Sequence, residues 1–168
     1  MGLNKEQRRK QIIRRCGKAA VLCYLILLSY FLFLSELHDH VYGLHAEYHY
    51  NLVPFREILR FWNAREQLGF TAVFLNLFGN VLGFLPLGAL LPAAFPWFHH
   101  AKRTIPAGAA FSLLVETLQL LTLIGRFDVD DVILNTIGVA LGYICFKAAN
   151  GVRRKKYRNG KNKKIHIH

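Results

Sequence analysis

Residues 113–143 have the sequence LLVETLQLLTLIGRFDVDDVILNTIGVALGY, which predicts two membrane helices joined by a short charged turn. Glu116 lies within the apolar run of residues 105–124, where burying an ionisable side chain in lipid is costly. The turn then carries four charged side chains, Arg126, Asp128, Asp130 and Asp131. Because ionisable groups inside the membrane generally mark function, we expect the functional site beside this turn.

Composition places the chain in the membrane. It has 168 residues, of which 53% are hydrophobic and 13% aromatic, and this is too apolar for a soluble domain. The net charge of +12 arises from 22 Lys and Arg against 10 Asp and Glu, a balance also found in nucleic-acid-binding proteins. Here the basic residues gather at the two ends of the chain, so we expect no nucleic-acid partner.

The apolar runs predict an all-α integral membrane protein, a four-helix transmembrane bundle. The expected spans are residues 18–37, 70–95, 105–124 and 131–147. Since helices rise about 1.5 Å per residue, the first run nearly crosses a hydrocarbon core roughly 30 Å thick. It is long for a signal peptide, and we expect it to be retained. Asp130 and Asp131 are expected to cap the fourth span, while Lys147 reaches the interface from its other end.

The segment of residues 38–69 should contain an outer amphipathic helix between the first two spans. Pro54 can start it, and apolar side chains follow at helical spacing. This helix either simply anchors the connection in the headgroups, or carries Arg56 or Arg60 toward the acids or a phosphate. Four histidines in this region, His38, His40, His45 and His49, have no metal-site spacing and are interpreted as solvated loop residues.

Basic residues also predict the topology. They are concentrated in residues 1–17, in the loop between the second and third spans, and in residues 148–168. Since loops rich in Lys and Arg stay in the cytoplasm, both termini should be cytoplasmic. The protein should then be a multi-pass protein of the bacterial plasma membrane, with the acidic turn facing outward and the basic tails touching anionic membrane lipids.

Polar side chains on three of the predicted spans should lie at the same depth in the membrane. Glu116 should lie about 12 Å below the outer end of its helix, in the outer half of the bilayer. Ser112 and Gln119 share its helix face. On the fourth span, Asp128, Asp131 and Asn135 follow one another along one face. Asn76 and Asn80 on the second span are four residues apart and reach a similar level. The sequence therefore predicts a single polar cluster.

Several chemistries suit such a cluster. Glu116, Asp128 and Asp131, with amide oxygens nearby, could hold a divalent cation such as Mg²⁺ or Ca²⁺. Arg126 can pair with Glu116 or an aspartate, or bind a phosphate or carboxylate through its planar guanidinium. Glu116 or an aspartate could instead act as an acid or base. Alternatively, the cluster is a satisfied network between helices that only holds the bundle together.

The motifs resemble those of the VanZ-like family of bacterial membrane proteins, whose best-known member accompanies glycopeptide-resistance clusters and is associated with teicoplanin resistance. The resemblance covers roughly residues 51–143. It rests on the motifs NLVPF, NLFGNVLGFLPLG, SLLVETLQL and GRFDVDDVILNTIGVALGY. The resemblance implies that residues 18–147 form a VanZ-like membrane domain. The positions carried over are Asn80, Pro86, Gly88, Glu116, Gln119, Arg126, Asp128, Asp131, Asn135 and Gly138.

The resemblance implies a plasma-membrane protein whose polar site faces the cell envelope and which lowers susceptibility to teicoplanin-type lipoglycopeptides. We expect the site to engage a lipid-linked envelope precursor or a lipid phosphate in the outer leaflet, with Arg126, Gln119, Asn80, Asn135, Asn76 and Arg56 as binding residues. An intramembrane enzyme acting on an envelope lipid, with Glu116, Asp128 and Asp131 as catalytic residues, is the alternative. A second alternative is that the protein is a small lipid transporter or flippase.

Two glycine pairs, Gly79 with Gly83 and Gly138 with Gly142, have the small-xxx-small spacing of tightly packed membrane helices. We expect them to serve contacts within the chain. The sequence leaves the oligomeric state open.

Overall fold

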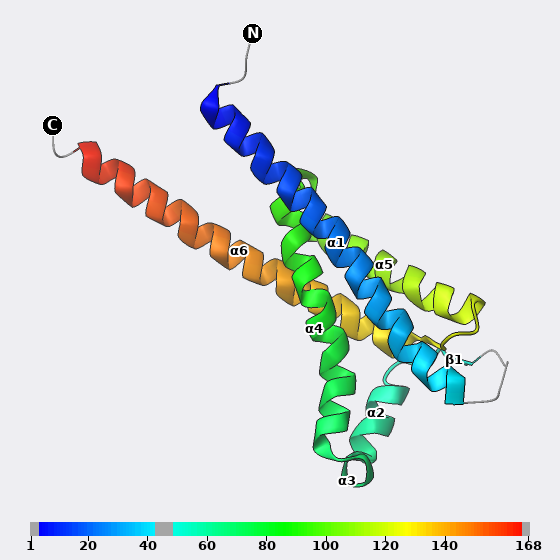
Figure 1. Ribbon diagram of the computed structural model, residues 1–168. Helices are drawn as coiled ribbons and strands as arrows, with labels where there is room; N and C mark the ends of the chain where they lie inside the picture. The colour runs from blue at the N-terminus through cyan, green and yellow to red at the C-terminus, as the bar shows by residue number, and fades with distance from the viewer. Residues whose placement is uncertain (1–3, 43–48, 166–168) are drawn as a thin grey trace.

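A computed structural model describes residues 4–42 and 49–165 and shows a helical bundle (Figure 1). Its long helices are α1 (Lys5–Tyr42), α4 (Phe70–Ala94), α5 (Ala101–Leu121) and α6 (Val129–Ile165). Shorter elements connect them, namely β1 (Tyr50–Asn51), α2 (Arg56–Asn63), α3 (Arg65–Leu68), η1 (Pro96–Phe98) and β2 (Phe127–Asp128). The predicted four-helix architecture with a short helix between the first two spans is confirmed.

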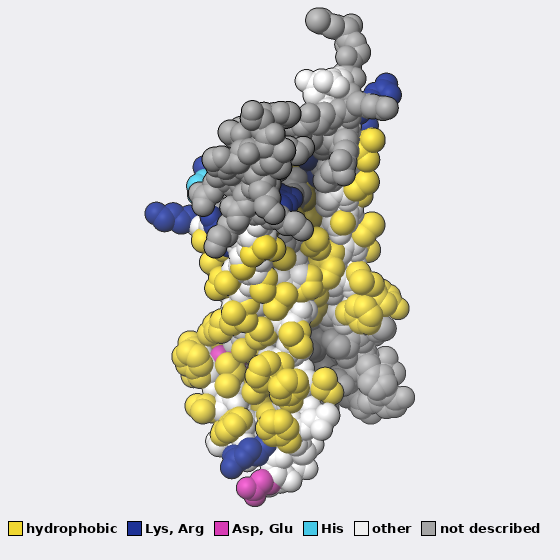
Figure 2. Space-filling model, turned by 90° about the vertical axis from the view of Figure 1, so that its left-hand side faces the viewer, with side chains coloured by type: hydrophobic (Ala, Val, Ile, Leu, Met, Phe, Trp, Pro, Cys, Tyr) yellow, Lys and Arg dark blue, Asp and Glu magenta, His cyan; other side chains and the backbone are white. Residues whose placement is uncertain are grey.

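Four of the described helices are long and apolar enough to cross a membrane. The candidate spans are Arg14–Phe33, Val73–Ala94, Ala101–Leu121 and Val129–Arg153. Figure 2 shows a broad belt of hydrophobic side chains across one face of the bundle, with Lys and Arg side chains above it and further charged side chains at the opposite end. This distribution is that of a multi-pass membrane protein, because the apolar belt matches the lipid and the charges match the interfaces.

The two ends of the bundle differ. The N-terminal end of α1 and the C-terminal end of α6 lie at one end, while α2, α3 and the strands lie at the other (Figure 1). This separation agrees with a topology in which both termini share one side of the membrane. Which side faces the cytoplasm stays a prediction from the basic residues.

Glycines allow α4 and α6 to pack backbone against backbone. A Cβ atom added at Gly142 would stand 1.9 Å from the Leu85 carbonyl oxygen, and one at Gly138 would stand 2.3 Å from that of Val81. On α4, a Cβ at Gly88 would lie 2.0 Å from the Val139 oxygen. The predicted within-chain role is therefore confirmed for Gly138 and Gly142. It does not extend to Gly79, whose added Cβ would meet nothing within 4 Å.

Helix α1 lies against α4 with only a small part of its surface. Val21 and Leu28 are its buried members of the hydrophobic core, which they share with Phe84, Leu87 and Val139. The Tyr24 hydroxyl donates a hydrogen bond to the Gly83 carbonyl oxygen. Most other apolar side chains of the α1 span, such as Leu22 and Ile26, are exposed and so face lipid. Helix α1 therefore packs against the rest of the bundle through only a few buried side chains.

Two structural features near the acidic turn were absent from the all-α prediction. Residues Tyr50–Asn51 pair in parallel with Phe127–Asp128, which brings the segment before α2 beside the turn before α6. Two residues per strand are too few to produce a recognisable alternation in the sequence. Phe55, directly before α2, has a left-handed backbone with φ of 66°. Because such a conformation is costly for a bulky residue, surrounding contacts must hold it.

Candidate functional site

A cavity of about 560 Å³ lies between α1, α4, α5 and the start of α6. Its polar lining comes from Asn76 and Asn80 on α4, Glu116 and Gln119 on α5, Arg126 in the turn, and Asp131 on α6. Its apolar lining comes from the α1 and α4 side chains Leu27, Leu28, Phe31, Leu75 and Phe84. The predicted meeting of acidic, amide and guanidinium groups from separate helices thus occurs in one cavity.

Glu116 is buried, with 4% of its surface exposed, and its carboxylate stabilises the charged turn. The Asp128 backbone N–H donates to Glu116 Oε2 at 3.1 Å. Ser112 and Gln119 are buried on the same face, as their spacing predicts. The Gln119 side-chain amide donates to the Leu32 carbonyl oxygen of α1 at 3.2 Å. Helix α5 therefore contributes both a cavity wall and a link to α1.

Asp128 lies behind the cavity lining and joins β1 to the start of α6. Its Oδ1 accepts hydrogen bonds from the Asn51 side-chain amide at 3.0 Å and from the Asp130 backbone N–H at 2.9 Å. The second of these bonds is that of a helix cap. Asp128 therefore supplies the side-chain cap of α6, a role that the sequence had suggested for Asp130 and Asp131, which stand instead in the first turn.

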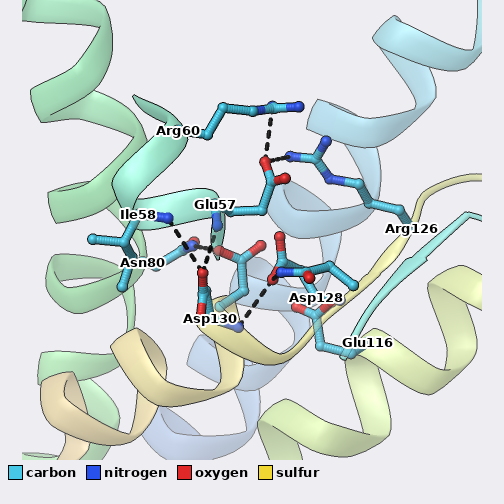
Figure 3. Close-up of polar contacts among 10 residues, drawn as sticks. Glu57, Ile58, Arg60, Asn80, Glu116, Arg126, Asp128 and Asp130 are labelled. Carbon is cyan, nitrogen blue, oxygen red and sulfur yellow. Dashed lines mark hydrogen bonds and ion pairs between the residues drawn. The ribbon is translucent and has the colours of Figure 1, made fainter. Parts of the chain in front are cut away.

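Asp130 anchors α2 from outside that helix (Figure 3). Its carboxylate accepts three backbone N–H groups, those of Phe55 at 2.5 Å, Glu57 at 2.8 Å and Ile58 at 3.2 Å. They belong to the N-cap residue Phe55 and to the first turn of α2, where backbone N–H groups have no partner within the helix. The bond to Phe55 also holds the left-handed residue in place. Asp130, only 1% exposed, thus fixes α2 beside the turn.

Arg126 pairs with an acid that sequence reasoning did not consider. Its guanidinium lies 3.5 Å from the Glu57 carboxylate on α2, and the same oxygen lies 2.8 Å from Arg60 (Figure 3). The Arg126 side chain is 39% exposed, whereas Glu57 is 13% exposed. Arg60 thus pairs with an acid of its own helix, and its predicted approach to the acids of the turn or to a phosphate stays a prediction. The shared carboxylate orients Arg126 while leaving part of its guanidinium open to the cavity it lines.

Asp131 faces the cavity and is tied to α4. The Asn80 side-chain amide donates to Asp131 Oδ1 at 2.5 Å. This bond joins two cavity-lining residues from different helices. Asn76, one turn earlier on α4, also lines the cavity and is exposed.

Two predicted binding residues lie away from the cavity lining. Asn135 is buried between α6 and α5, where its amide donates to the Ser112 hydroxyl at 2.8 Å. Arg56 is exposed at the start of α2. Asn135 links α6 to α5 through this bond, but its buried Oδ1 has no hydrogen-bond partner among the described residues, so the network alternative is not fully satisfied here.

The structure describes no group of three or more His, Cys, Asp or Glu side chains that could hold a metal ion. This finding covers only the described residues. The divalent cation expected at Glu116, Asp128 and Asp131 stays a prediction. Of the four histidines, His49 is exposed, the side chains of His38 and His40 lie outside the described part of the chain, and His45 lies outside it entirely.

The sequence reasoning gave no role to Asn51 or Glu57, and it interpreted Asp130 only as a cap of the fourth span. Asn51 begins the NLVPF motif, so its buried hydrogen bond to Asp128 gives that motif a physical reason. Glu57 is the first acid of α2 and lies among arginines, which indicates an ion pair. Asp130 lies between Asp128 and Asp131, the two acids that share a predicted helix face. Its role depends on a contact between distant segments, which no local pattern reveals.

A comparison with protein families finds a match to the model described as VanZ/LLP1 over residues 21–150. This range includes all of α4 and α5, parts of α1 and α6, the residues that line the cavity, and the charged turn. No curated protein and no solved structure matches the chain.

Proposed function

Because the chain belongs to the VanZ/LLP1 family, we propose that it is a bacterial plasma-membrane protein that binds the phosphate-bearing head of an envelope lipid in the outer leaflet. Such binding would alter the presentation of lipid-linked precursors and thereby contribute to resistance to teicoplanin-type lipoglycopeptides. The observation that carries the proposal is the cavity lined both by Arg126 of the turn and by amide groups of α4 and α5.

Arg126 supplies the chemistry for an anionic head. A guanidinium donates several N–H groups in one plane and matches phosphate oxygens in a two-pronged contact. Asn76, Asn80 and Gln119 add amide groups along the same lining. Glu57 holds the guanidinium beside the cavity through an ion pair that is partly exposed to solvent. A phosphate can therefore contact the open side of Arg126 without requiring that this ion pair break.

The carboxylates of Glu116 and Asp131 in the lining would repel an anionic ligand, unless their hydrogen-bond partners reduce this repulsion. Glu116 accepts the Asp128 backbone N–H, and Asp131 accepts the Asn80 amide. These bonds turn part of each carboxylate toward protein donors and reduce its effect on the cavity. Glu116 and the aspartates thus support a positioning role, in which they hold the turn that carries Arg126. This interpretation favours binding over catalysis by these acids.

The test is the lipid that the purified full chain retains in a neutral detergent. Native mass spectrometry of the wild-type protein should reveal a bound phosphate-containing lipid. In Arg126→Gln, the retained fraction should fall about tenfold or more, because a hydrogen bond to a charged group contributes roughly 1.5–3 kcal/mol. Arg65→Gln is the matched control, since Arg65 is exposed on α3 and hydrogen-bonds the Trp62 carbonyl oxygen. Equal retention in Arg126→Gln and Arg65→Gln would contradict the proposal.

A further inference from the structure

The cavity changes in character from one end to the other. Its polar lining is buried most deeply at Glu116 and Gln119, which are each 4% exposed, whereas the Arg126 side chain at the turn is 39% exposed. Its apolar end is open, because Leu27, Phe31 and Leu75 are 51%, 59% and 65% exposed although they line the cavity. The opening is therefore bordered by hydrocarbon side chains from α1 and α4.

This opening lies within the membrane-spanning parts of both helices. Leu27 and Phe31 belong to the candidate span Arg14–Phe33, and Leu75 belongs to Val73–Ala94. Side chains exposed at such positions contact lipid. The mouth between α1 and α4 consequently faces the hydrocarbon of the bilayer, whereas Arg126 lies in the turn at the membrane surface.

Glycine creates space at this mouth. Gly79 lines the cavity, and a Cβ atom built there would meet nothing within 4 Å. Gly83, one turn further along α4, also lines the cavity, and the nearest atom to its added Cβ is Leu28 Cδ1 at 3.6 Å. Close helix packing explains why position 142 is glycine, but it does not explain the glycine at position 79. The missing side chain widens the groove beside α1.

We infer that the ligand enters sideways from the bilayer between α1 and α4 and is a lipid whose hydrocarbon chain lies over Gly79 while its anionic head reaches Arg126. This inference rests on the proposed function and adds the ligand's route into the cavity and the place of its hydrocarbon chain. A volume of about 560 Å³ suits a head and the first part of one chain. The rest of the chain stays in the bilayer through the open mouth, so a wholly water-soluble ligand would leave the apolar half unused.

A photoactivatable alkyl phosphate with a diazirine in its chain tests this route. We expect labelling of the wild-type protein in detergent to concentrate on peptides that contain residues 27–31 and 75–83. Gly79→Phe should lower this labelling about tenfold, because the ring occupies the groove in which the chain would lie. Leu82→Phe is the matched control, since Leu82 is on the same helix and 57% exposed but does not line the cavity.

Inorganic phosphate distinguishes the two sources of the head group. Added at millimolar concentration, it should leave the labelling unchanged, since it lacks the chain. Complete displacement would overturn the lipid route while leaving the phosphate site of the proposed function intact. Labelling lost in Gly79→Phe but unchanged in Arg126→Gln would support the groove and contradict the proposed phosphate contact.

Two further outcomes count against the inference. Labelling spread evenly over lipid-facing positions, such as Leu114 and Ile144, would overturn it without any variant, so the test does not depend on the folding of Gly79→Phe. Equal labelling of Gly79→Phe, Leu82→Phe and the wild-type protein would do the same.

Discussion

Replacing Gly142 by alanine should force α4 and α6 apart locally and destabilise the bundle. The added Cβ would stand 1.9 Å from the Leu85 carbonyl oxygen and 3.0 Å from the Ala89 nitrogen, so backbone must move. Ordinary overpacking costs about 1–3 kcal/mol, and a clash with backbone should reach the upper end or exceed it. The apparent melting temperature of the purified protein in detergent should therefore fall by about 10 °C.

Gly79→Ala is the matched control for this measurement. It adds the same methyl group to a membrane-spanning glycine, but the new Cβ meets nothing within 4 Å. Its melting temperature should stay near that of the wild-type protein. A similar fall in both variants would show that the loss reflects glycine in these helices generally and would contradict the backbone contact between α4 and α6.

Replacing Asp130 by alanine should release α2 from the turn. Three backbone N–H groups lose their acceptor, and the left-handed Phe55 loses the contact that holds it. The cost should be about 2 kcal/mol or more, since helix caps and charged hydrogen bonds each contribute on this scale. Amide hydrogen exchange in residues 56–63 should then accelerate about thirtyfold or more.

Two comparisons control the Asp130 experiment. Glu66→Ala removes an acid of the same outer segment, but the Glu66 side chain is 85% exposed, and exchange in α2 should be unchanged. Asp130→Asn keeps one carbonyl oxygen as an acceptor and should accelerate exchange less than Asp130→Ala. Unchanged exchange in Asp130→Ala would mean that other contacts hold α2. In that case Asp130 would not be the anchor of α2.

The spans and much of the cavity lining could be predicted because their signals are local. An apolar run of sufficient length predicts a membrane helix. An acid within such a run, such as Glu116, is a candidate functional residue because burying its charge in lipid is energetically costly. Helical spacing then placed Gln119 on the same face as Glu116. Depth, counted at helical rise, brought Asn76 and Asn80 to the same level, and the cavity includes both.

The partners of the charged residues could not be predicted because they depend on contacts between distant segments. Asn51 meets Asp128 through a two-residue strand pair, and Glu57 meets Arg126 only because α2 packs beside the turn. Helical spacing alone places Asp128 and Asp131 on the same helix face and gives no reason to assign them different roles. Only the fold separates them, since Asp131 lines the cavity while Asp128 caps α6 behind it.

The proposed function requires that the Arg126 end of the cavity face the cell exterior, and labelling of introduced cysteines in intact cells tests this most directly. The chain's own Cys16, Cys23 and Cys145 would first be replaced by serine. With a membrane-impermeant maleimide, Glu66→Cys at the α2 and α3 end should react in intact cells. Lys102→Cys at the start of α5 should react only after the cells are permeabilised. The reverse pattern would place the cavity at the cytoplasmic face and contradict binding in the outer leaflet.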